Sequence, residues 1–508
     1  TWQPPPRSGC CSRMPESCSS RDTLIDARTP TPGFPQRSRA CVDERVADSP
    51  RSRLQMNAMR ILMISDVYFP RVNGVSTSIQ TFARNFARKG HGVTVIAPDY
   101  GQDGARARTL GPAPGQLRDA SPEPDGFEIV RIPSRYLPLD PEDRVLRASR
   151  IRRHHDRLSR GGFDLVHVQT PFVAHYAGLR IARRLGIPVI ESYHTFFEQY
   201  VDKYVTFLPP AWLRLAARHL SVAQCRAVDG LVVPSHAMLA VLEGYGVRTP
   251  AAVIPTGIEP DRFDHGDGER FRRHHGIDPD RPVLVHVGRL AFEKNIDFLL
   301  RMLPEVRRVV PDVLLVIAGE GPARRSLEAL TAELGLTGHV CFVGYLSRDG
   351  ALEDCYCAGD AFVFASRTET QGLVLLEAMA LGVPVVSTAV MGTKEVLGGG
   401  KGSLIAREDT AEFAAKAARL LTDADLRATL GEQARAYARA WSAPALADRM
   451  LELYRSIACA AGNRRSRHQP RLGSSSSARR GFDGARGRGG GWPEVGERPR
   501  GAGRGCRR

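Results

Sequence analysis

The feature that most constrains the fold of this chain is an alternation of short, continuously apolar runs with longer segments of helical periodicity, which begins near residue 60. Strands that are apolar on both faces are typical of parallel sheets covered by helices on both sides. The first helical segment places Ile79, Phe82 and Phe86 at helical spacing and ends at Gly90. Strands are therefore expected at residues 61–65, 93–97, 127–132, 165–169, 189–193, 231–234 and 252–255.

The same pattern starts again after the polar stretch 261–280. The second series of strands is expected at residues 283–287, 314–318, 340–343, 361–365 and 383–387. Two such series predict an α/β protein with two Rossmann-like, doubly wound domains, at residues 59–260 and 261–440. Sheets of this kind bind ligands at the carboxyl ends of their strands, so the two domains are expected to face a common cleft. A last helix, at 441–460, is expected to cross back to the first domain.

The positive charge of the chain is concentrated at its two ends. Of the net +16, residues 1–55 carry +3 and residues 463–508 carry +10, which leaves about +3 for the middle. Both ends are rich in Arg, Pro, Gly and Ser, a composition that buries too little apolar surface to offset the entropy of ordering. We expect residues 1–58 and 461–508 to be disordered, or to be translated sequence outside the native protein, since Met56 and Met59 stand just before the first strand.

The remaining composition favours a cytoplasmic protein. No run of about 18 apolar residues is present, so no transmembrane helix is expected. The first thirty residues lack the basic and then apolar pattern of a signal peptide. Five of the ten Cys fall in the two ends and the others are scattered, which is typical of a reducing compartment.

Two strand-to-helix turns are candidate phosphate sites. In the segment 68–77, Gly74 would let backbone N–H groups approach a phosphate at the start of a helix. In the segment 287–296, Arg289 and Lys294 can converge on one anionic group, because Arg grips a diphosphate through two parallel hydrogen bonds and Lys adds a point charge. The alternatives are an ordinary turn at Gly74 and a solvated turn in which Glu293 pairs with Lys294.

The segment 366–379 carries two carboxylates that could accept hydrogen bonds from sugar hydroxyls. Glu369 lies in the loop after an expected strand, and Glu377 lies eight residues later inside the next helix, among apolar neighbours. Gly372 and Leu373 stand at the start of that helix, where backbone N–H groups have no intrahelical partner and can bind a phosphate. The alternative is one helix-capping Glu and one Glu on the helix surface.

Two histidines lie near the carboxyl ends of first-domain strands. His194 lies at a strand end among aromatic residues, where it could contact a substrate or donate a hydrogen bond to a phosphate. His167 is placed in a similar way. For each of them the alternative is a structural histidine.

Together these segments resemble glycosyltransferase family 4, a large group of retaining enzymes with the two-domain GT-B fold. The most specific match is the spacing of Glu369 and Glu377, followed by the residues Ala-Met-Ala-Leu-Gly-Val-Pro-Val-Val. Gly288-Arg289-Leu290 and the segments 233–235 and 254–258 agree with it in the expected order. The resemblance covers residues 59–457.

The resemblance implies transfer of a hexose from a nucleotide diphosphate sugar, UDP-glucose or GDP-mannose, with no cofactor. Gly74 would approach the donor phosphates, and Arg289 and Lys294 would stabilise the leaving diphosphate. Glu369 would hold the hexose hydroxyls and Glu377 the ribose. The other positions implied for the donor site are Val343 and Gly344 at the nucleotide base, Gly372 and Leu373 at the phosphates, and His194 near the transferred sugar.

We expect this transfer to need no metal ion. Metal-dependent transferases place an Asp-x-Asp pair at a strand end, whereas Asp278-Pro-Asp280 falls in a linker and Asp423-Ala-Asp425 at the start of a helix.

The segment 194–204 is similar to bacterial enzymes that glycosylate membrane lipids, such as diacylglycerol glucosyltransferases. The residues then expected near the acceptor are Asp66, His167, Tyr193 and Glu198. Two segments rich in Arg and apolar residues, 144–160 and 208–226, fit helices that lie on anionic lipid at the inner face of a membrane. A mannosyl donor with a phosphoinositide or polysaccharide acceptor stays open.

Other readings of the sequence are a nucleotide-sugar epimerase or hydrolase on the same fold, and a phosphorylase with a lysine-bound pyridoxal cofactor. A non-enzymatic RNA-binding protein would depend on the basic tails. Because the middle of the chain is nearly neutral, no nucleic-acid partner is expected.

Overall fold

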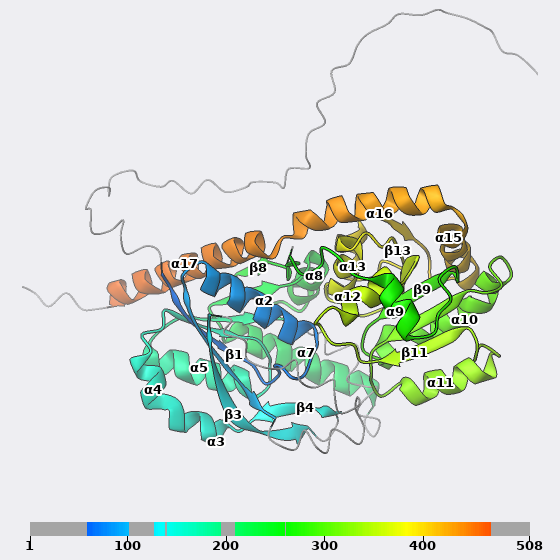
Figure 1. Cartoon of the computed structure of the whole chain (residues 1–508). Helices are drawn as coiled ribbons and strands as arrows, with labels where there is room; N and C mark the ends of the chain where they lie inside the picture. Colours follow the sequence, from blue (N-terminus) through cyan, green and yellow to red (C-terminus); the bar gives the residue numbers. More distant parts are fainter. Residues whose placement is uncertain (1–57, 101–125, 138–139, 195–208, 260, 469–508) are drawn as a thin grey trace, which may run out of the picture. The chain divides into compact units, whose positions relative to one another are not determined.

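The computed structural model describes residues 58–100, 126–137, 140–194, 209–259 and 261–468. They form two lobes, each built on one sheet, and the α/β fold class predicted from the sequence is confirmed (Figure 1). The predicted tails lie almost wholly outside the described residues, as does Glu198.

The first sheet has eight strands in the order β4-β3-β2-β1-β5-β6-β7-β8. All neighbours are parallel except β3 and β4, which are antiparallel. Its strands are β1 (Arg60–Ile64), β2 (Gly92–Asp99), β3 (Glu128–Leu137), β4 (Asp140–Leu146), β5 (Leu165–Val168), β6 (Val189–Ser192), β7 (Gly230–Val233) and β8 (Ala251–Val253). The helices between them are α2 (Gly74–Arg88), α3 (Ala148–Ile151), α4 (His155–Arg160), α5 (Val173–Leu185), α7 (Pro210–Arg226) and α8 (His236–Gly244).

The second sheet is wholly parallel, in the order β11-β10-β9-β12-β13-β14. Its strands are β9 (Val283–Val287), β10 (Leu314–Ala318), β11 (Val340–Gly344), β12 (Ala361–Phe364), β13 (Val385–Ser387) and β14 (Ser403–Ile405). Its helices are α9 (Gly268–His274), α10 (Ile296–Arg307), α11 (Arg324–Glu333), α12 (Ala351–Cys357), α13 (Leu373–Ala380), α14 (Thr393–Leu397), α15 (Thr410–Thr422) and α16 (Ala424–Ala438).

Both sheets reverse their strand order at one point, between β1 and β5 in the first and between β9 and β12 in the second. Ligands of doubly wound sheets bind at the carboxyl ends of the strands at such a switch point. The loops after β1, β5, β9 and β12 are therefore the part of the fold to inspect for a site.

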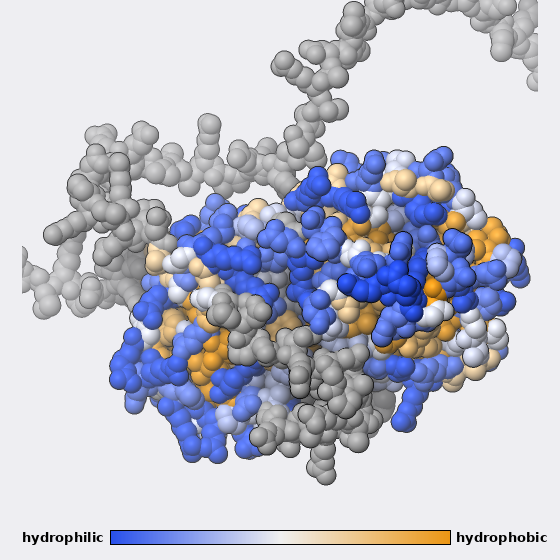
Figure 2. Space-filling view, in the orientation of Figure 1, coloured by the Kyte–Doolittle hydropathy of each residue, from blue (hydrophilic) through white to orange (hydrophobic). Residues whose placement is uncertain are grey.

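Each sheet is covered on both faces. Separate apolar clusters lie on the two faces of the second sheet, one against α10 and α15 and the other against α12 and α13. The first sheet is enclosed in the same way. This two-sided burial explains why the strands read as continuous apolar runs. On the face shown in Figure 2, most of the surface of the described residues is hydrophilic, and apolar side chains are exposed in smaller areas.

The last helix, α17 (Ala443–His468), belongs to the first lobe. Its residues Met450, Leu451 and Tyr454 are buried in the same cluster as β1 and α2. The ring of Tyr454 lies edge-on to Phe86, 5.6 Å between centroids, and Figure 1 shows α17 running alongside α2. The helix continues to His468, past residue 461 where the tail was expected to begin.

The basic segment 144–160 is not one amphipathic helix, which corrects the sequence interpretation. It begins inside β4, which pairs with β3, and continues as the short helices α3 and α4. Arg144 is buried, with its guanidinium 5.2 Å from the centre of the Tyr100 ring. The segment 208–226 is helical from Pro210 to Arg226, as expected.

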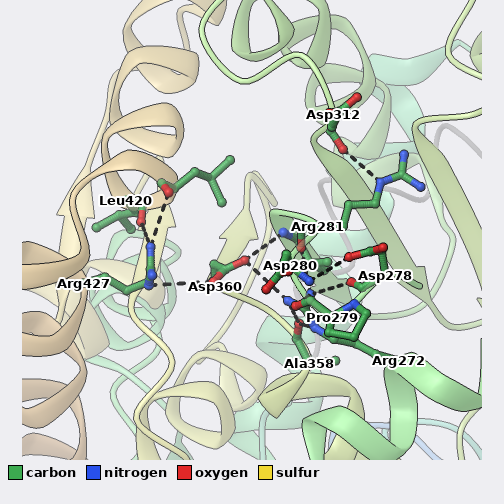
Figure 3. Close-up of polar contacts among 12 residues, drawn as sticks. Arg272, Asp278, Pro279, Asp280, Arg281, Asp312, Ala358, Asp360, Leu420 and Arg427 are labelled. Atoms are coloured by element: carbon green, nitrogen blue, oxygen red, sulfur yellow. Dashed lines mark hydrogen bonds and ion pairs between the residues drawn. The ribbon is translucent and has the colours of Figure 1, made fainter.

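The Asp278-Pro279-Asp280 segment lies before β9, at the end of the second sheet opposite to the switch-point loops. Figure 3 shows its polar contacts. Asp278 accepts a hydrogen bond from the Asp280 backbone N–H at 2.9 Å, so it stabilises a turn. Arg272 donates to the carbonyl oxygens of Asp278, Pro279 and Arg281. This part of the chain therefore serves packing at the amino end of the sheet.

Three further results come from the described residues alone. No helix among them is both long and apolar enough to cross a membrane. No group of three or more His, Cys, Asp or Glu side chains in these ranges is placed to hold a metal ion. The five cysteines in this part of the chain are free thiols.

Candidate active site

Lys294 and Glu369 meet at the switch point of the second sheet. Lys294 ends the short 3-10 helix Phe292–Lys294 that follows β9, and Glu369 lies in the loop between β12 and α13. The Lys294 Nζ atom donates to Glu369 Oε2 at 2.5 Å, and the two side chains are 21% and 20% exposed. The alternative pairing of Lys294 with Glu293 is wrong. The pair can be reached from solvent, so a ligand can approach both charges.

The turn that carries Arg289 is held in place by two glycines that the sequence analysis missed. The backbone N–H of Leu290 donates to Glu320 O at 2.9 Å, beside Gly319 and Gly321. A Cβ atom on Gly319 would lie 1.9 Å from the carbonyl oxygen of Gly288, and both glycines have positive φ. The signal was a Gly-Glu-Gly run directly after an expected strand.

Glu377 is fully buried inside α13 and already has two partners. Arg348 donates to Oε1 at 2.9 Å, and the Tyr356 hydroxyl donates to Oε2 at 2.8 Å. Burial, together with the negative charge of Glu377, raises the pKa of Tyr356 well above its usual value. The alternative of a surface Glu is therefore wrong. Arg348 and Tyr356 were not found from the sequence, because they lie 29 and 21 residues away.

Two of the predicted phosphate-binding residues stand at helix starts. Gly372, in a left-handed conformation with φ 93°, precedes Leu373, the first residue of α13. In the first lobe, Gly74 is the first residue of α2 and is exposed, with no atom within 4 Å of the place where a Cβ would stand. Both helix ends can present backbone N–H groups to an anion.

The predicted base-binding strand end lies beside the Arg289 turn. Val343 and Gly344 close β11, and the Gly344 carbonyl accepts a hydrogen bond from Gly319 N–H at 2.7 Å. The guanidinium of Arg324 lies 5.9 Å from the centre of the Phe342 ring on the same strand.

His194 lies just after β6 and is in direct contact with the Glu369 loop. Its carbonyl oxygen accepts a hydrogen bond from Thr370 Oγ1 at 3.0 Å, and its Nε2 lies 3.0 Å from Gln169 Oε1. Burial lowers the pKa of His194 to about 4, so the imidazole is neutral at neutral pH. It can therefore offer a hydrogen bond but not a fixed positive charge.

Three residues expected near the acceptor are instead occupied with structural contacts. Both ring nitrogens of His167 are taken, Nδ1 by the Tyr454 hydroxyl at 2.5 Å and Nε2 by Ser192 Oγ at 2.8 Å. Burial lowers the pKa of His167 to about 3. The Tyr193 hydroxyl donates to Ser221 Oγ of α7 at 2.9 Å.

Asp66 is the third of these residues, and it is fully buried. Its carboxylate accepts hydrogen bonds from Leu146 N–H at 2.9 Å, Thr170 Oγ1 at 3.0 Å and Ala174 N–H at 2.8 Å. Burial raises its pKa to about 6, and the hydrogen bonds partly oppose that rise. These contacts join β1, β4 and α5.

A small pocket lies between the two lobes, next to Glu377. The space at its centre is about 20 Å³, enough for one water molecule. Its walls come from α2, from the linker after β8 and from the second lobe: Thr77, Gln80, Thr81, Arg84, Gly257, Ile258, Glu259, Arg262, Phe263, Arg348, Leu373 and Glu377. Of the predicted site residues, it brings together Leu373 and Glu377.

Comparison with known proteins shows the family to which the chain belongs. The model described as "Glycosyltransferase Family 4" matches residues 72–262, and that described as "Glycosyl transferases group 1" matches residues 267–437. The chain is 32% identical over 339 residues to the alpha-monoglucosyldiacylglycerol synthase of Streptococcus pneumoniae, covering 65% of this chain and 71% of that protein. It is 30% identical over 414 residues to a GDP-mannose-dependent alpha-mannosyltransferase of Mycolicibacterium smegmatis, covering 78% and 98%.

The chain belongs to glycosyltransferase family 4. The suspected resemblance is thus confirmed, and the general activity of the chain is that of a glycosyltransferase. A solved structure of Anabaena HepE in complex with UDP shares the fold, with a TM-score of 0.59 and 18% identity over 78% of this chain and all of that one. The first match lies within the first lobe, without β1 and α17, and the second covers the sheet and helices of the second lobe.

In this family 4 glycosyltransferase the chain passes between the lobes twice, and the two passages touch. Ile258 and Ser442 form an isolated parallel bridge, and Ile258 N–H donates to Trp441 O at 2.8 Å. A Cβ atom on Gly257 would lie 2.5 Å from Ala443 Cα. The linker therefore has little room to move at this point.

Proposed function

We propose that the chain transfers a hexose, glucose or mannose, from a nucleotide diphosphate sugar to a membrane lipid or glycan, with retention of the anomeric configuration. The observation that carries the proposal is the Lys294–Glu369 pair. Lys294 lies in the segment that follows the Arg289 turn, and Glu369 stands three residues before Gly372 at the start of α13. Cationic side chains beside a helix N-terminus suit a diphosphate, and a carboxylate beside them suits the hydroxyls of its sugar.

In the proposed reaction the bond between the sugar C1 and the diphosphate oxygen breaks first. The electron pair leaves with the nucleoside diphosphate, whose charge is stabilised by Arg289, Lys294 and the N–H groups at the start of α13. The acceptor hydroxyl attacks C1 from the face that the diphosphate has left, and its proton passes to a diphosphate oxygen. Neutral His194 holds the sugar by a hydrogen bond, so catalysis is positioning together with charge stabilisation.

The transfer is proposed to proceed without a metal ion, because the side chains of Arg289 and Lys294 supply the positive charge that a metal would otherwise bring to the diphosphate. Turnover in excess EDTA should equal turnover in Mg²⁺. A loss of activity in EDTA that Mg²⁺ restores would contradict this part of the proposal.

Helix α7 is the proposed contact with a lipid acceptor. Its outer face carries three of the large apolar side chains that are exposed among the described residues, Trp212 at 76%, Leu215 at 56% and Leu220 at 51%. Arg214 and Arg218 are exposed on the same helix. An apolar face beside cationic side chains suits a helix lying on an anionic membrane, and α7 is bonded to the strand end of Tyr193 and His194 through Ser221. A lipid acceptor bound there would enter the cleft from the membrane side.

Two assays test the proposal. The protein is incubated with UDP-glucose or GDP-mannose, with and without vesicles of diacylglycerol and anionic phospholipid, and both the glycolipid and the free nucleotide are quantified. Acceptor-dependent release of nucleotide with an α-linked product from an α-linked donor is expected, with the anomer read by NMR. Nucleotide release without an acceptor would indicate a hydrolase, and a β-linked product would exclude retention.

A further inference from the structure

The loop that carries Glu369 is bonded to the first lobe and to the interlobe linker by its next two residues. Thr370 donates to the His194 carbonyl oxygen at 3.0 Å. Gln371 makes two hydrogen bonds to the backbone of one residue: Thr256 N–H donates to Oε1 at 2.8 Å, and Nε2 donates to Thr256 O at 2.6 Å. Both Gln371 and Thr256 are buried.

A primary amide is the chemical group that this pairing requires. It offers one donor and one acceptor side by side, and so satisfies both backbone groups of Thr256 at once. A carboxylate in its place would face the Thr256 carbonyl with a second acceptor, and an apolar side chain would leave two buried backbone groups unpaired.

Thr256 is itself fixed. Its hydroxyl donates to Ser78 Oγ on α2 at 2.8 Å, and Ser78 is buried in the helix that begins at Gly74. The next residue, Gly257, lies against Ala443 where the two passages of the chain touch. Gln371 is therefore attached to one of the more constrained points of the linker.

Along the chain, Gln371 directly precedes Gly372 and the start of α13, and it follows Glu369 by two residues. A shift of Gln371 would move the α13 N–H groups and the Glu369 carboxylate together, relative to Gly74 on α2. The chain Gln371–Thr256–Ser78 thus joins the two helix ends that were assigned to the donor phosphates.

We propose that Gln371 is a positioning residue of the donor site, which fixes the turn 369–373 to the interlobe linker and so sets its place relative to the start of α2. This proposal rests on the proposed function, because it concerns the site of the sugar donor. Gln371 acts through the backbone and does not touch the substrate.

The experiment compares Gln371→Met and Gln371→Glu with the wild type and with Thr331→Val. Thr331 is buried in α11 and donates to Leu327 O at 2.8 Å, so Thr331→Val removes a buried hydrogen bond to a backbone carbonyl away from the site. Misplacement of reacting groups by about 1 Å costs on the order of 100-fold in rate. Gln371→Met is therefore expected to lose about 10- to 100-fold in kcat/KM for the donor, with an acceptor KM close to that of Thr331→Val and a lower Tm, because two buried backbone groups lose their partner.

Gln371→Glu adds a readout that a general loss of packing would not give. A protonated carboxyl group, like an amide, donates with one oxygen and accepts with the other, and burial next to a carbonyl raises the pKa of such a group. The activity of Gln371→Glu relative to the wild type at the same pH is expected to rise from pH 8 to pH 5.5.

The outcomes separate this inference from the proposed function. If the wild type transfers no sugar from any donor, the proposed function fails. If the wild type is active, the inference is overturned by a Gln371→Met donor kcat/KM equal to that of Thr331→Val, or by a pH-independent ratio for Gln371→Glu.

Discussion

Substitutions of Lys294 and of Glu369 are expected to change the affinity for a nucleoside diphosphate in opposite directions. Lys294 Nζ lies 2.5 Å from Glu369 Oε2, so a nucleoside diphosphate must compete with that carboxylate for the ammonium group. Glu369→Gln removes the competing charge and keeps the shape of the side chain. UDP or GDP should then bind more tightly, although sugar transfer is lost.

The magnitude follows from the exposure of the pair. Side chains that are about a fifth exposed are partly screened by solvent, and pairs near the surface contribute about 0.2–1 kcal/mol. Because 1.4 kcal/mol corresponds to a tenfold change, Kd for the nucleoside diphosphate should fall by about 1.5- to 5-fold. Loss of the predicted contact to the hexose hydroxyls should lower kcat/KM on the order of 100-fold. Lys294→Met removes a charged hydrogen bond to the phosphate, worth about 1.5–3 kcal/mol, and should weaken binding by about 10- to 100-fold.

Isothermal titration with UDP and GDP measures both affinities, and the vesicle assay measures transfer. Glu305→Gln is a matched control, because Glu305 of α10 forms a partly exposed pair with Arg308, just after the end of that helix. It should change neither quantity. Weaker nucleotide binding by Glu369→Gln, or transfer at the wild-type rate in either site variant, would refute the reasoning.

Three further predictions concern stability and the membrane. Arg348→Met leaves the buried Glu377 carboxylate with Tyr356 alone, and should lower the free energy of unfolding by about 3–5 kcal/mol in urea titration; a change under 1 kcal/mol would contradict the pairing. His167 stays neutral in the folded protein down to about pH 3, while the unfolded chain takes up a proton below about pH 6.5. The contribution of neutral His167 to the free energy of unfolding is therefore fully present above pH 6.5 and is lost by up to about 1.4 kcal/mol per pH unit as the pH falls. The free energy of unfolding should accordingly differ less between pH 7 and pH 5 in His167→Gln than in the wild type. Trp212→Ser with Leu215→Ser should reduce sedimentation with anionic vesicles while UDP affinity is unchanged; undiminished sedimentation would exclude α7 as the contact.

The sequence predicts the two sheets well, because burial on both faces leaves a continuous apolar run at each central strand. It does not predict β4, whose residues Asp140–Leu146 are largely polar and pair antiparallel at the edge of the sheet. The three-residue edge strand β14 was missed because Ser403–Ile405 is too short for a periodic signal.

Site residues could be predicted only as far as strand-end position allows. Lys294 and Glu369 were expected in one site, and the structure places them in contact, but nothing local in the sequence shows that they bind each other. The position of His167 near the end of β5 suggested a site, whereas its partner Tyr454 is 287 residues away in α17. Contacts of this range depend on the path of the whole chain.

That path has a consequence for synthesis. The first lobe is discontinuous, because residues 262–440 are inserted between β8 and the helix that completes its apolar face at Met450, Leu451 and Tyr454. A ribosome releases these three residues only after the entire second lobe has been made, so the second lobe is free to fold while the first still exposes the side of β1 and α2 that α17 covers. A fragment ending at residue 258 would expose that surface permanently, and is expected to aggregate when produced alone.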